Sequence, residues 1–147
     1  MLQFVAGHRY DVSMIKTSIT YSGQKHCELT HAPSGSRIET DAPRDNDGKG
    51  ERFSPTDLVG AALGSCILTT MAIVGERDGL SIANARAEVE KEMVSGPRRI
   101  GTLRVKISLP RNLTPEQRIK LETIARSCPV QKSLHPDVQV SINFEYS

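Results

Sequence analysis

The chain contains three cysteines, Cys27, Cys66 and Cys128, and their thiols are the side chains with the widest choice of chemistry. A thiolate is a nucleophile, and two neighbouring thiols can form a disulfide. A free cysteine is also among the most buried residue types and then acts as a small, inert hydrophobic group. For each cysteine taken alone, both interpretations stay open.

Cys66 and Cys128 are more informative as a pair than separately. Each falls at an inward-facing position on a different predicted helix, and two packed helices can bring Cα atoms within the roughly 4.4–6.8 Å that a disulfide requires. The sequence leaves their approach open. Cys27 lies in an alternating strand between His26 and Glu28, without a matching partner, and is interpreted as a packing residue.

A reactive Cys66 would need a cation from elsewhere in the chain. Burial in apolar surroundings raises the pKa of a thiol and leaves it inert. The positive end of the helix dipole acts only over the first turn, whereas Cys66 lies about three turns into its predicted helix. An Arg or Lys outside that helix must therefore stabilise the thiolate if Cys66 reacts.

The first half of the chain predicts three strands and then a loop. Alternating β-prone residues mark 14–21, 26–31 and 37–40, with turn-prone Ser22-Gly23 and residues 33–35 between them. Residues 41–52 combine glycine, proline and charges without a period. This loop of about a dozen residues has a length that is often functional, so it could cover a site.

A long apolar helix is predicted after this loop. Ser54 supplies an N-cap hydroxyl, Pro55 fits the first helical position and Asp57 places an acid in the first turn. The helix is expected to reach residue 77, before Gly79, and residues 58–74 carry no charge. Because this run is shorter than the roughly 20 apolar residues of a membrane span, we expect the helix to be buried and no membrane to be involved.

The second half of the chain predicts a hairpin, two helical segments and a last strand. Residues 85–94 and 103–109 alternate around a turn at 95–97 and are interpreted as a solvated hairpin. Thr114 with Gln117 forms a capping box, and an apolar helical stripe follows that ends at Cys128, just before Pro129. A short helical turn to residue 134 and a strand over 138–146 complete the order βββ-α-ββ-αα-β, an α+β fold.

Two segments of the chain resemble one known family. The run FSPTDLVGAALGSC at 53–66 is similar to the helix around the first cysteine of OsmC-like proteins, which include osmotically inducible protein C and the organic hydroperoxide resistance proteins. The run CPVQKSL at 128–134 is similar to the segment around their second cysteine. The resemblance implies one OsmC-like domain over residues 1–147, with 1–13 as an N-terminal extension. It also implies an intertwined homodimer, with antiparallel sheets from both subunits around central helices.

The resemblance also implies a reaction. Cys66 would attack an organic hydroperoxide and become a sulfenic acid, and Cys128 would condense with it to form a disulfide. A dithiol reductant would then reopen the disulfide, without a metal or a bound organic cofactor. A site lined by Leu58, Leu63 and Ile67 would be apolar and would suit an organic substrate.

The chain departs from the family pattern where an Arg and a Glu assist the thiolate. The Glu position, ten residues before the first cysteine, is occupied by Thr56. Asp57, one place later, is the nearest acid and is the candidate for the role of that Glu. For the Arg, residues Arg37, Arg44 and Arg52 are candidates. Arg37 is preferred because a strand holds a side chain better than a loop, although a solvated surface role is an equal alternative. These departures resemble a less characterised subgroup.

Composition narrows the remaining possibilities. The 147 residues, 37% hydrophobic and 24% charged, fit one domain, and the net charge of +2 is scattered, which argues against nucleic acid. Three cysteines at wide spacings and no visible export signal predict a cytoplasmic protein. The four histidines lack metal-site spacing. A non-enzymatic protein that binds a small ligand is the alternative function, and a structural dimer with inert thiols is a further one.

Overall fold

The structure is a computed structural model that describes residues 14–147 and divides the chain into two compact units, one ending at Phe53 and one beginning at Ser54. The N-terminal extension expected over residues 1–13 lies outside the described residues. Each unit is described by itself.

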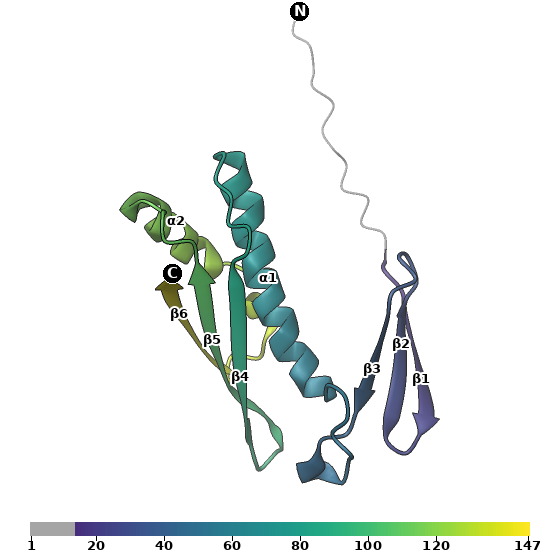
Figure 1. The fold of residues 1–147 in the computed structure, drawn as a ribbon. Helices are drawn as coiled ribbons and strands as arrows, with labels where there is room; N and C mark the ends of the chain where they lie inside the picture. Colours follow the sequence, from purple (N-terminus) through teal and green to yellow (C-terminus); the bar gives the residue numbers. More distant parts are fainter. Residues whose placement is uncertain (1–13) are drawn as a thin grey trace, which may run out of the picture. The chain divides into compact units, whose positions relative to one another are not determined.

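The first unit contains a three-stranded antiparallel sheet, as the sequence predicts (Figure 1). Its strands are β1 (Thr17–Gly23), β2 (His26–His31) and β3 (Arg37–Asp41). The β1–β2 turn is centred on Gln24 and Lys25, with φ values of 51° and 64°. Positive φ at both central residues matches the twist of a hairpin, so the turn lies slightly later than Ser22-Gly23. The loop after β3 contains one 3₁₀ turn, Arg44–Asn46.

One face of this first sheet is apolar and the other is polar. Ile19, Leu29 and Ile38 are direct cross-strand neighbours, and Tyr21 and Cys27 form the next row on the same face. The side chains of Ile19, Ile38 and Tyr21 are 60%, 51% and 65% exposed. A contiguous exposed apolar surface marks an interaction site, so we expect another surface to cover this face.

The second unit begins with helix α1 (Pro55–Arg77), whose predicted limits are confirmed. The Ser54 hydroxyl accepts a hydrogen bond from the Asp57 N–H at 3.1 Å, and the Asp57 carboxylate accepts one from the Ser54 N–H at 2.8 Å. This reciprocal capping box satisfies two N–H groups that the start of a helix leaves unpaired. The helix ends at the cap residue Asp78, and Gly79 follows with φ +69°.

The second sheet has the strand order β4-β5-β6, with β4 (Arg86–Val94), β5 (Arg99–Leu109) and β6 (Gln139–Tyr146). β4 and β5 are antiparallel, but β6 pairs parallel to β5, so the expectation of purely antiparallel sheets was wrong for this strand. The connection from β5 to β6 passes through helices α2 (Pro115–Ala125) and α3 (Pro129–Ser133) (Figure 1). A crossover of that length is what allows parallel pairing.

The core of the second unit lies between this sheet and the helices. Leu103, Val105 and Ile107 on β5 are at most 1% exposed, and Leu63 on α1 and Leu121 on α2 belong to the same cluster. The expected hairpin of β4 and β5 is present, and Arg104 and Lys106 keep one face of β5 exposed. The other face of β5 is covered by the helices, and β6 makes β5 the central strand.

Glycines bring α1 close to β4. A Cβ atom on Gly64 would lie 3.0 Å from a methyl group of Val89, and one on Gly60 would lie 3.4 Å from the same side chain. The backbone of α1 therefore runs directly against β4 over these two turns, which orients the helix on the sheet (Figure 1).

Within the single chain, one face of α1 is buried, so the expected burial of this helix is met on that face. The buried face includes Leu63, Ile67 and Met71, whereas Ile73 on the opposite side is 49% exposed. The sheet of a single chain covers one side of the helix and leaves the other uncovered. By length and composition α1 could also cross a membrane, a test that core helices of soluble proteins pass as well.

Candidate functional site

The structure brings Cys66 and Cys128 together within the second unit. Cys66 lies in the middle of α1 and is half-buried, and Cys128 is fully buried in the core, against which Cys66 packs. The two thiols interact with one another, and both are free. The approach that the sequence left open is therefore present in the fold.

Cys128 does not end a helix, and this part of the sequence interpretation was wrong. α2 stops at Ala125, and Cys128 has an extended conformation, with φ −62° and ψ 137°. The residue before a proline is disfavoured in the helical region, so Pro129 forces this break. Pro129 then begins α3, for which Cys128 is the N-cap. Its burial, which the apolar stripe predicted, is confirmed.

The pKa of the Cys128 thiol is raised above its ordinary value. Burial is the largest cause, because it penalises the thiolate, and the neighbouring Cys66 raises the pKa further. The N–H of Gln131, which donates to Sγ of Cys128 at 3.3 Å, acts in the opposite direction but does not outweigh burial. Cys128 is thus held as a neutral thiol by its burial.

The surroundings of Cys66 are apolar with one hydroxyl. Thr70, one turn further along α1, places Oγ1 4.0 Å from Sγ of Cys66. Leu63 and Ile67 are fully buried in the core, so the expectation that they line an accessible site was wrong. A shallow apolar hollow of about 220 Å³ instead lies beside the next turn, where Leu68 and Thr69 are among its lining residues.

An ion pair fixes the beginning of α1. The Nζ atom of Lys91, on β4, lies 2.6 Å from Oδ1 of Asp57 and donates to Oγ1 of Thr56 at 2.7 Å. It also donates to Oγ of Ser54 at 3.3 Å. The Lys91 side chain is only 16% exposed, so its ammonium group exchanges water for three protein acceptors. The acid of the first turn therefore pairs with a lysine, and Thr56, at the position of the family's Glu, joins the same cluster.

The pKa of Asp57 is lowered by this cluster. Burial acts first and raises the pKa, but the hydrogen bonds from Lys91 and from Ser54, together with the Lys91 charge, outweigh it. Asp57 is therefore a carboxylate at neutral pH, and its charge is balanced by Lys91.

The three arginine candidates all belong to the first unit. Arg37 lies on β3, as expected, where it is exposed and makes no side-chain hydrogen bond or ion pair among residues 14–147. Nε of Arg52 lies 2.8 Å from Oε2 of Glu39, and Nε of Arg44 donates to the Lys49 carbonyl at 3.1 Å. Arg44 and Arg52 thus make polar contacts within their own unit, whereas the guanidinium of Arg37 makes none there among the described residues.

Sequence reasoning missed Lys91, although a signal was present. Lys91 alternates with Ala87 and Val89 on the apolar side of its strand, and a charged residue in such a row needs a buried partner. Gln131 was also missed. Its backbone bonds Cys128, while its side-chain oxygen is buried without a hydrogen-bond partner among the described residues.

Within residues 14–147, no group of three or more His, Cys, Asp or Glu side chains is placed to hold a metal ion. The chemistry that the described site offers is therefore that of a thiol pair, one member half-buried on a helix and the other buried and protonated.

The chain is similar to known proteins in sequence and in fold. The sequence profile described as OsmC-like protein matches residues 48–143. A solved structure from Psychrobacter arcticus 273-4, of a protein assigned to osmotic stress induction and the detoxification response, is 38% identical. The match covers 92% of this chain and 99% of that one, with a TM-score of 0.86. None of the curated proteins matches this chain.

More distant structures share the fold. The organic hydroperoxide resistance protein OsmC of Legionella pneumophila is 14% identical, with a TM-score of 0.74 over 91% of this chain and 98% of that one. The organic hydroperoxide resistance protein OhrB of Bacillus subtilis is 17% identical, with a TM-score of 0.66 over 90% and 98%. At these identities the likeness concerns the fold alone.

Proposed function

Because this chain belongs to the OsmC-like family, we propose that it reduces organic hydroperoxides with Cys66 as the attacking thiol and Cys128 as the resolving thiol. The observation that carries the proposal is the contact between the two thiols, one half-buried and the other fully buried. The names of the hydroperoxide resistance proteins that share the fold support the same class of reaction.

The proposed reaction begins at Cys66. Its thiolate attacks the terminal oxygen of the hydroperoxide, the O–O bond breaks, and an S–O bond forms. The alkoxide leaves and takes a proton to become an alcohol, and Cys66 is now a sulfenic acid. Cys66 is suited to this first step because it is the more accessible of the two thiols.

Cys128 performs the second step. Its sulfur attacks the sulfenic sulfur, water leaves, and a Cys66–Cys128 disulfide forms. Because the pKa of Cys128 is raised, its thiol is a poor nucleophile toward peroxide, and its buried contact with Cys66 restricts it to this partner. A dithiol reductant then restores both thiols by exchange. Three free cysteines fit a reducing compartment, so we place the protein in the cytoplasm.

We also propose which cation of the chain assists the Cys66 thiolate. Lys91 is committed to Asp57 at the start of α1, about nine residues before Cys66, and serves to hold the helix on β4. Arg37 remains our candidate for the thiolate, since its guanidinium is uncommitted within its own unit. Arg37→Ala should slow peroxide consumption, whereas Arg37→Lys should restore part of the rate.

The proposal includes a homodimer. Ile19, Ile38 and Tyr21 expose one face of the first sheet, and α1 exposes an uncharged stripe that includes Thr69 and Ile73. A second copy would cover both surfaces, since soluble proteins rarely leave such patches open. Sedimentation at micromolar concentration should show a dimer, and a folded monomer would contradict this part of the proposal.

A peroxide-consumption assay with dithiothreitol tests the enzymatic proposal. Wild type should turn over tert-butyl hydroperoxide, Cys66→Ser should lose turnover, and the matched control Cys27→Ser should keep it. Substantial turnover by Cys66→Ser would overturn the assignment of the attacking thiol.

A protein that binds a small ligand without chemistry is the second candidate. One observation favours it: Thr56 lies at the position of the family's Glu, and the carboxylate of Asp57 is paired with Lys91. Under this alternative the wild-type protein would consume no peroxide while remaining folded, so the same assay separates the two functions.

A further inference from the structure

The hydroxyl of Thr70 is the polar group of α1 that faces the half-buried thiol. Thr70 lies four residues after Cys66, on the same face of the helix, and its Oγ1 lies 4.0 Å from Sγ of Cys66. The threonine is itself half-buried. In the described part of the chain, that sulfur is the one hydrogen-bond partner of this hydroxyl. The peroxide chemistry proposed above uses both thiols but gives the hydroxyl no part.

Other hydroxyls on the helices of this unit bond to the backbone instead. Ser65 donates to the Ala62 carbonyl at 3.1 Å, and Thr123 donates to the Ile119 carbonyl at 2.8 Å. This is the usual arrangement within a helix, because the carbonyl three or four residues earlier is always in reach. The hydroxyl of Thr70 lies against a sulfur instead, so its orientation has a cause beyond the helix backbone.

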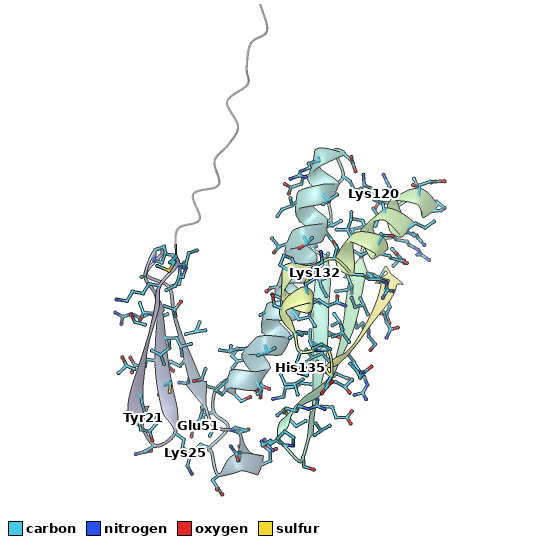
Figure 2. All side chains as sticks on the ribbon, turned by 180° about the vertical axis from the view of Figure 1, so that it is seen from behind. Tyr21, Lys25, Glu51, Lys120, Lys132 and His135 are labelled. Atoms are coloured by element: carbon cyan, nitrogen blue, oxygen red, sulfur yellow. The ribbon has the colours of Figure 1, made fainter. Side chains whose placement is uncertain are left out.

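Lysines elsewhere in this unit are directed to acids or to solvent. Lys91 and Lys120 each form an ion pair with an aspartate. Figure 2 shows Lys120 on α2 and Lys132 on α3, and both residues are exposed. Within residues 14–147, the side-chain donors that contact the sulfur of Cys66 are the Cys128 thiol and the threonine hydroxyl. Both are neutral groups.

A hydroxyl in this place favours the thiolate over the thiol. It can accept a hydrogen bond from an S–H group or donate one to a thiolate. The first bond is weak, since a thiol is a poor donor, whereas the second is charge-assisted and therefore stronger and shorter. The separation of 4.0 Å is long even for sulfur, as the weak neutral bond would be, and the charge of a thiolate would draw the hydroxyl closer.

We propose that Thr70 is a further catalytic residue, whose hydroxyl donates to the Cys66 thiolate and raises the fraction of Cys66 that is ionised at neutral pH. The hydroxyl contacts the reacting sulfur itself, and the thiolate is the form that attacks. It adds to the cation assigned to Arg37 and does not replace it. The inference rests on the proposed peroxidase function, but the effect on ionisation is measurable without peroxide.

Alkylation of Cys66 by iodoacetamide tests the proposal, because the thiolate is the reacting form. The reduced full-length protein is treated from about pH 5 to about pH 10, and mass spectrometry follows the tryptic fragment 53–77. At neutral pH, Thr70→Val should react about three- to tenfold more slowly than wild type. The two rates should converge at high pH, where all of the thiol is ionised. Thr70→Ser keeps the hydroxyl and should restore the wild-type profile.

Thr123→Val is the matched control, since it removes the same hydroxyl from a helix position where the partner is a backbone carbonyl. Its profile for Cys66 should equal that of wild type. Cys27, measured in the same samples on fragment 26–37, should react equally in all variants. Equal rates for wild type and Thr70→Val at neutral pH would overturn the proposal. So would a loss that persists at high pH, or a Thr70→Ser profile that matches Thr70→Val.

Peroxide consumption by the same variants separates this inference from the proposed function. Thr70→Val should slow the consumption of tert-butyl hydroperoxide at neutral pH by about the same factor as alkylation, and an unchanged rate would contradict a catalytic part for Thr70. A wild type that consumes no peroxide would contradict the peroxidase proposal and with it that catalytic part, while the alkylation profile would still show whether the hydroxyl stabilises the thiolate.

Discussion

Replacing Lys91 by Met should destabilise the second unit by an amount that depends on pH. Methionine keeps the apolar stem of the side chain and removes the ammonium group that contacts Asp57, Thr56 and Ser54. The capping box of α1 stays intact, because Ser54 and Asp57 still bond each other. The variant therefore isolates the ion pair from the helix cap.

The magnitude follows from the exposure of the two partners. A hydrogen bond to a charged group contributes about 1.5–3 kcal/mol, whereas an exposed ion pair contributes about 0.2–1 kcal/mol. The Lys91 side chain is 16% exposed, but that of Asp57 is 42% exposed, so solvent screens part of the interaction. We expect Lys91→Met to lower the free energy of unfolding by about 1–2 kcal/mol at neutral pH.

The pH dependence has a definite sign. The pKa of Asp57 is lowered in the folded protein, so its contribution to stability is present above the unfolded pKa of about 3.9. That contribution is lost as the pH falls through the folded pKa. The difference between wild type and Lys91→Met should therefore be largest near neutral pH and should shrink below about pH 4.

Urea unfolding followed by circular dichroism measures this difference, at one protein concentration for all variants. Lys106→Met is the matched control, since Lys106 is 46% exposed and its ion pair with Glu145 lies on the surface. Its effect should stay below about 1 kcal/mol. Equal effects of the two substitutions, or a Lys91→Met effect that does not change with pH, would refute the reasoning.

Two further substitutions test other parts of the fold. Gly48→Ala would place a Cβ atom 1.7 Å from the Ala42 carbonyl oxygen, so the loop must move, and we expect a loss of about 1–3 kcal/mol in urea unfolding; unchanged stability would show that the loop adapts freely. Tyr146→Phe removes the hydroxyl that donates to Glu122, which should cost about 1 kcal/mol. Burial and then Glu122 raise the pKa of Tyr146 to about 12, so this stabilisation is present below about pH 10 and is lost as the pH rises through 12. An ultraviolet titration in which wild type lacks a late-titrating tyrosine would contradict that assignment.

The features that the sequence predicted well are those with a local cause. Thr114 and Gln117 form the predicted capping box, and the predicted N-cap Ser54 forms one with the first-turn acid Asp57, because each box involves residues three apart along one chain segment. The strands that alternate strongly were also found. These interactions need no knowledge of distant partners.

The features that the sequence interpretation missed depend on distant or competing interactions. Parallel pairing of β6 with β5 is a tertiary choice, which no strand pattern contains. Cys128 is buried, as the apolar stripe predicted, but it does not lie in a helix. The steric effect of Pro129 on the preceding residue outweighed the helical periodicity of the sequence. The ion pair of Lys91 was missed for a similar reason, since its partner Asp57 lies 34 positions earlier in the chain, on another element.

The most direct test of the central claim is the identity of the disulfide formed after one equivalent of tert-butyl hydroperoxide. Trypsin separates the cysteines, since Cys27, Cys66 and Cys128 lie in the fragments 26–37, 53–77 and 127–132. Mass spectrometry of the oxidised wild type should show fragment 53–77 linked to 127–132, and Cys128→Ser should instead carry an oxidised Cys66 and fail to turn over with a dithiol. A disulfide that includes Cys27, or peroxide consumption without any disulfide, would contradict the account.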